Sequence, residues 1–119
     1  MGRILQIRVL AQTYRPRDVE RAWPRLCALA WPEPLARPDE IMGVLELISV
    51  LDDQFQFGPL APEVKADLGP GLRKTTGLKS ELESALADRR PSLADSLSYA
   101  LEEALDAMEK LAPEPDKFL

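Results

Sequence analysis

The chain has 119 residues, of which 45% are hydrophobic and 29% are charged, and its formal net charge is −5. This length and composition are typical of one globular domain with a sizeable core, and not of a disordered or membrane-spanning protein. The chain has no histidine and one cysteine, which excludes a Ser-His-Asp triad, a Cys-His pair, a histidine-ligated metal and an internal disulfide.

Residues 3–14 carry apolar side chains that fit two periodicities, because they alternate as in a strand and also fall on one helical face. We favour a helix that ends before Pro16. The alternative is a lone strand, which would need a partner from another subunit. Gln6 and Arg8 interrupt the apolar run, so it lacks the continuous apolar stretch of a secretion signal. Together with the single cysteine, this predicts a cytoplasmic protein.

Two Trp-Pro pairs, at 23–24 and 31–32, lie on either side of Cys27. A helix is predicted to begin at Pro16, and Pro24 predicts either a kink in this helix or the start of a second short helix. The second Trp-Pro pair is predicted to end the helical segment. Helical spacing places both tryptophans in the core. Cys27 has apolar neighbours and is therefore predicted to be an inert structural thiol.

Arg17, Arg21 and Arg25 are spaced to form one basic stripe along this helical segment. Residues 1–25 contain six arginines and two acidic residues, whereas the rest of the chain contains nine basic and eighteen acidic residues. A basic beginning and an acidic body can attract each other within the fold, which is the favoured interpretation. Nucleic-acid binding through the arginine stripe is the alternative.

Residues 38–55 predict a central helix, because apolar side chains cover a wide face of it. Gly43 in its middle costs about 1 kcal/mol relative to alanine, so we expect another backbone to approach closely there. A short helix is predicted over residues 62–68. Gly69 and Pro70 are expected to end this helix.

Residues 71–80 are predicted to form a flexible loop before a helix that begins at the capping-box sequence 80–83. The loop is not a P-loop, because five residues separate its glycines and Leu78 precedes the lysine. Its side chains and the following helix N-terminus have the composition of a modest anion-binding site. Glu81 and Glu83 already complement the helix dipole, so a solvated loop is the favoured interpretation and the anion site is the alternative. The residues assigned to this site are Arg73, Lys74, Thr75, Thr76 and Lys79.

The last helix is predicted to begin at a second capping sequence, residues 92–95, and to reach Leu111, and residues 113–119 are expected to fray. Its acidic residues could hold magnesium, but we favour a solvated acidic face and predict no metal site. These residues are Glu102, Glu103, Asp106 and Glu109.

These elements together predict an all-α, single-domain bundle of five or six helices over residues 1–119. The favoured function is a small cytoplasmic interaction or regulatory module that binds a protein partner or forms a homo-oligomer. No enzymatic activity, cofactor or membrane association is expected. The alternatives are nucleic-acid or phosphate-ligand binding through the arginine stripe or the 71–80 segment and, less favoured, a carboxylate-metal enzyme.

Overall fold

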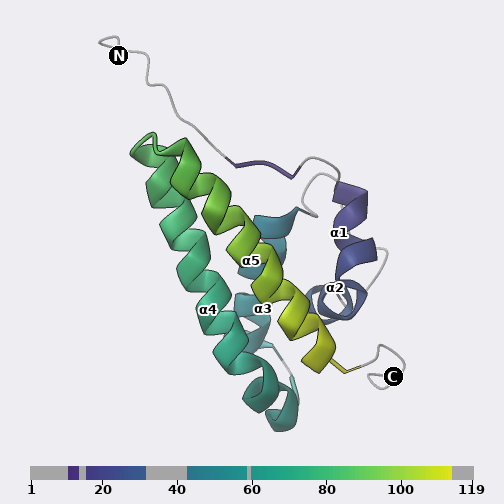
Figure 1. Ribbon diagram of the computed structural model, residues 1–119. Coiled ribbons are helices and arrows are strands. Elements are labelled where there is room, and N and C mark those ends of the chain that lie inside the picture. The colour runs from purple at the N-terminus through teal and green to yellow at the C-terminus, as the bar shows by residue number, and fades with distance from the viewer. Residues whose placement is uncertain (1–10, 14–15, 32–42, 59, 114–119) are drawn as a thin grey trace, which may run out of the picture.

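The computed structural model describes residues 11–13, 16–31, 43–58 and 60–113. These ranges contain five helices and no strand, so the predicted all-α class is confirmed (Figure 1). None of the described helices is both long and apolar enough to traverse a lipid bilayer. The helices are α1 (Pro16–Ala22), α2 (Pro24–Ala30), α3 (Val44–Phe57), α4 (Pro62–Ala87) and α5 (Pro91–Leu111).

The two long helices α4 and α5 form an antiparallel pair that lies side by side along most of its length (Figure 1). α3 packs against α4 and α2, while α2 also contacts α5 and α1. The five helices pack around one apolar core. Each helix contributes to it, with buried side chains that include Val19, Leu26, Leu47, Leu68 and Leu105.

The crossing of α4 and α5 depends on a small residue. A Cβ atom added to Gly71 would lie 2.6 Å from Cγ of Met108, which is itself buried. Next to this contact, the fully buried hydroxyl of Thr75 donates a hydrogen bond of 2.9 Å to the carbonyl oxygen of Leu72. Glycine at 71 therefore lets the two helices approach more closely than any larger residue would allow.

The predicted loop over residues 71–80 is wrong, because α4 runs without interruption from Pro62 to Ala87. Its buried residues fall at 68, 72, 75, 82 and 85, the spacing of one helical face, and that face packs on α5. Pro70 costs a helix about 3 kcal/mol by local propensity alone, but it is exposed and the burial of this face outweighs it. The capping sequence at 80–83 lies inside α4, so no helix begins there.

The turn between α4 and α5 is a Schellman motif. Arg90 donates its amide to the carbonyl oxygen of Ala85 at 2.9 Å, and Arg89 donates to that of Leu86 at 3.1 Å. Arg89 has a φ of 55°, the left-handed conformation that this motif requires. α5 then begins at Pro91 with Arg90 as its N-cap, so the predicted capping sequence at 92–95 is not used.

The central helix is shorter at its start than predicted. α3 begins at Val44, Gly43 precedes it in an extended conformation, and residues 38–42 lie outside the described part of the chain. The atoms that lie close to Gly43 belong to the side chains of Thr13 and Glu46, and not to another backbone as predicted. The amide of Val44 donates a 2.8 Å hydrogen bond to Oγ1 of Thr13. Glycine at 43 thus makes room for two side chains at the helix start and not for a backbone crossing in the middle of the helix.

Residues 11–13 form neither helix nor strand, so the predicted helix over residues 3–14 does not include them, and residues 1–10 and 14 are not described. The break at Pro24 separates α1 from α2, which was one of the two predicted outcomes. Both tryptophans are core residues as predicted, with Trp23 6% and Trp31 8% exposed, and Cys27 is fully buried.

Candidate binding site

The N-terminus of α2 is capped by a residue from α5. Trp23 at the N-cap makes no side-chain capping bond, and Pro24 at the first helical position has no amide hydrogen. The next two amides, of Arg25 and Leu26, both donate to the carboxylate of Glu109 at 2.7–3.0 Å. The following amide, of Cys27, makes the first intrahelical bond to the carbonyl of Trp23. The Glu109 carboxylate therefore provides the acceptor that the start of this short helix lacks.

Two further hydrogen bonds join α2 to α5. The indole Nε1 of Trp23 donates to Oδ1 of Asp106 at 2.8 Å, and Nη1 of Arg25 donates to the carbonyl oxygen of Ala112 at 3.2 Å. Asp106 and Glu109 were predicted to belong to a solvated acidic face. The structure corrects this, because both carboxylates accept hydrogen bonds that fix α2 on α5.

Burial raises the pKa of the Glu109 carboxyl above its ordinary value. The hydrogen bonds from the amides of Leu26 and Arg25 and the positive charge of Arg25 oppose this rise, but desolvation has the larger effect. Within the described residues, no three acidic or cysteine side chains are grouped so as to hold a metal ion.

A pocket of about 510 Å³, partly open to solvent, lies between α1, α3 and α5, and we call it the α1–α3–α5 pocket. The side of the pocket formed by α1 meets that formed by α5 at Trp23, whose hydrogen bond to Asp106 fixes their relative position. Residues 11–13 and the start of α3 close a third side. The apolar lining consists of Ala11, Val19, Ala22, Trp23, Val44, Leu45, Leu82 and Leu101.

The polar lining of this pocket has one sign of charge. Asp18, Glu102 and Asp106 contribute carboxylates, and among the described residues no lysine or arginine lines the pocket. Its volume lies within the range of about 300–1,000 Å³ that is typical of ligand pockets. An apolar interior with an acidic rim suits a ligand that combines apolar groups with a positive charge. The remaining polar lining residues are Gln12, Thr13 and Ser98.

The residues predicted to bind an anion lie elsewhere, on α4. Arg73 and Lys74 are exposed, Thr75 points into the core, and Lys79 forms a 2.9 Å salt bridge with Glu83. The hydroxyl of Thr76 donates to the carbonyl of Arg73 at 3.0 Å. No helix begins at Ser80, so the N-terminus on which the anion-site prediction depended does not exist. The structure does not bring these five residues together as one site.

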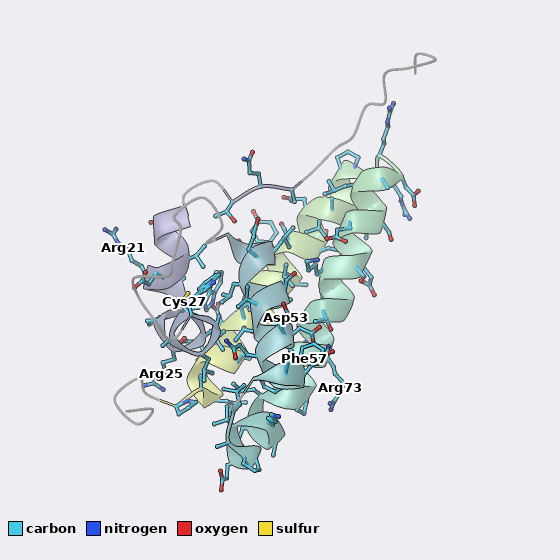
Figure 2. The ribbon with its side chains drawn as sticks, turned by 180° about the vertical axis from the view of Figure 1, so that it is seen from behind. Arg21, Arg25, Cys27, Asp53, Phe57 and Arg73 are labelled. Carbon is cyan, nitrogen blue, oxygen red and sulfur yellow. The ribbon has the colours of Figure 1, made fainter. Side chains whose placement is uncertain are left out.

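The predicted arginine stripe is also divided. Arg21 belongs to α1 and Arg25 to α2, and the chain leaves the helical conformation at Trp23 between them. Figure 2 shows Arg21 and Arg25 beside these short helices, and Arg73 on the far side of the molecule on α4. The side chain of Arg17 lies outside the described part of the structure. One continuous basic helical face is therefore not formed.

Sequence reasoning missed the pocket, because its residues come from five separate parts of the chain. No protein-family model matches the chain, and no curated protein or solved structure is similar enough to it to suggest a function. The geometry and charge of the pocket are therefore the basis for a functional proposal.

Proposed function

We propose that this protein is an interaction module whose α1–α3–α5 pocket receives a short segment of a protein partner that carries both apolar and basic side chains. The observation that supports the proposal is the composition of the part of the pocket lining that the structure describes, with apolar walls, three carboxylates and no basic residue. Apolar side chains of the partner supply the burial, and its basic groups are attracted to the rim and determine its orientation. The single buried cysteine fits a module of the reducing cytoplasm.

The rim carboxylates can be tested without disturbing the fold. Asp18 and Glu102 are exposed, whereas Asp106 accepts the hydrogen bond from Trp23 and should remain unchanged. The double variant Asp18→Asn/Glu102→Gln removes two of the three rim charges. The matched control Asp67→Asn/Glu103→Gln removes two exposed charges that do not line the pocket.

The probe is a short amphipathic peptide of leucine and lysine, with a leucine–glutamate peptide of the same pattern for comparison. We expect the lysine peptide to bind the wild type and the glutamate peptide not to bind. The double variant Asp18→Asn/Glu102→Gln loses two ion pairs with this peptide, of about 0.5 kcal/mol each, and should therefore bind it about fivefold more weakly than the wild type. This loss of affinity should shrink at high salt. Calorimetric titration that finds equal affinities for the two peptides, or equal effects of the two double variants, would contradict the proposal.

The apolar part of the pocket calls for a separate variant. Ala22 is exposed at the end of α1 and lines the pocket, so Ala22→Trp places a ring in its mouth. This variant is expected to abolish peptide binding while leaving the unfolding transition unchanged. Ala66→Trp, on the exposed face of α4, is the control and is expected to bind the peptide like the wild type.

A further inference from the structure

We infer that the occupant of the α1–α3–α5 pocket is the N-terminal segment of a second copy of this chain, residues 3–10, so that the protein forms a homodimer by exchanging these segments. This inference rests on the proposed function, because it names the partner for the same pocket. Its basis is the match between the sequence of residues 3–10 and the lining of the pocket.

The segment has the two properties that the pocket requires. It contains five large apolar residues, and its only charged residues are Arg3 and Arg8. The pocket offers apolar walls and the carboxylates of Asp18, Glu102 and Asp106. A segment of charge +2 thus faces a rim with three acidic groups, which favours association and makes it sensitive to salt.

The position of the segment in the chain also connects it to the pocket. It is followed directly by residues 11–13, which line one side of the pocket and are held there by the hydrogen bond from Val44 to Thr13. In a symmetric dimer, each copy would place residues 3–10 next to its own pocket and insert them into that of its partner. Such an interface is the same on both copies, as the closed two-fold symmetry of most homodimers requires.

The sequence favours a second copy over the chain's own segment. For residues 3–10 to lie back over the pocket beside residues 11–13 of the same chain, a tight turn would have to join the two stretches. Residues 4–13 contain no glycine, proline, asparagine, aspartate or serine, the residues that favour tight turns. A segment that does not turn back can instead reach a neighbouring molecule.

The test measures the mass of the full-length chain in solution by light scattering or sedimentation at low salt. The wild type is expected to have twice the 13.3 kDa mass of one chain. Arg3→Glu/Arg8→Glu is expected to raise the dimer dissociation constant at least about tenfold, because it turns two attractions into repulsions. The control Arg73→Glu/Lys74→Glu changes the net charge equally on exposed α4 positions and is expected to leave the dimer intact.

Two additional measurements make the result specific. Combining Arg3→Glu/Arg8→Glu with Asp18→Arg/Glu102→Arg should restore the dimer, because the charges are then exchanged. The leucine–lysine peptide should compete for the pocket and convert the wild-type dimer to monomer. A monomeric wild type, or a dimer that Arg3→Glu/Arg8→Glu leaves unchanged, would overturn the inference.

The same samples separate this inference from the proposed function. If the chain is monomeric and yet binds the leucine–lysine peptide in its pocket, the proposed function stands and the segment exchange is wrong. If Arg3→Glu/Arg8→Glu instead makes a monomeric chain bind the peptide more tightly, the segment occupies its own pocket, and the exchange is again wrong. If the chain is a dimer that the peptide neither binds nor dissociates, both proposals fail.

Discussion

Replacing Glu109 by alanine tests the hydrogen bonds that hold α2 on α5. α2 has only seven residues, which is too short for a helix to be stable on its own in water. The substitution leaves the amides of Arg25 and Leu26 without their acceptor in a partly buried position. Loss of an N-cap costs about 1–2 kcal/mol, and hydrogen bonds to a charged group contribute about 1.5–3 kcal/mol.

Desolvation of the Glu109 carboxylate offsets part of the stabilisation that these hydrogen bonds provide, as the raised pKa of this carboxyl shows. We therefore expect Glu109→Ala to lower the free energy of unfolding by about 2 kcal/mol. Urea denaturation measures this loss, and hydrogen exchange should show lost protection at the amides of Arg25 and Leu26. Glu103→Ala, an exposed change on the same helix, should stay within about 0.5 kcal/mol of the wild type. If both variants lose equally little, the capping argument is refuted.

The raised pKa of Glu109 also predicts how stability depends on pH. The folded state binds the proton of this carboxyl more tightly than the unfolded chain does. The contribution of this proton binding to the free energy of unfolding is therefore fully present below the ordinary glutamate pKa. It is lost as the pH rises through the folded-state pKa of Glu109. Urea titrations across this window should show the difference in unfolding free energy between wild type and Glu109→Gln falling with rising pH and then levelling off. A difference that rises with pH would contradict the desolvation argument.

Four further substitutions, each followed by urea denaturation, test separate contacts. Gly71→Ala should destabilise the protein by about 1 kcal/mol, since the clash with Met108 exceeds the gain in helix propensity. Gly77→Ala in the same helix has no atom within 4 Å of the new Cβ and should stabilise by about 0.5–1 kcal/mol, so effects of the same sign would contradict the packing argument. Arg89→Gly should stabilise by up to about 1 kcal/mol by relieving a φ of 55°, and a clear loss would show that the side chain matters more than the strain. Trp23→Ala should cost about 3–5 kcal/mol, and a loss below about 1 kcal/mol would mean that the ring is not a core anchor.

Local sequence signals predicted the elements that local chemistry determines. The start of α2 at Pro24 follows from the missing amide hydrogen and the fixed φ of proline, and the buried leucines of α5 follow helical spacing. The burial of Trp23 was readable for the same reason, because it shares a stripe with Val19.

The continuity of α4 was not predictable from local signals. Gly69, Pro70 and Gly71 form a sequence that ordinarily ends a helix. No local feature of the sequence shows that α5 will cover the apolar face of α4. The glycine at position 71 is explained by tertiary packing, because a side chain there would clash with Met108. The predicted loop was wrong because the packing of this face on α5 outweighs the local helix propensities on which the prediction depended.

The candidate site was hidden for a different reason. The lining of the pocket joins residues 11–13 to residues on α5, and Glu109 lies 84 residues from the Arg25 amide that it caps. No periodicity or spacing encodes such contacts. One signal was present, namely the basic first 25 residues and the acidic remainder, and it indicated attraction without showing where the charges would gather.

Chemical-shift mapping with the leucine–lysine peptide tests the central proposal most directly. The proposal predicts that the backbone amides that shift most cluster around the pocket, at Thr13, Val44, Ser98 and Leu101. It also predicts that Ala22→Trp removes these shifts. Shifts that concentrate instead on residues 73–79 of α4, or that are spread evenly over the surface, would contradict it.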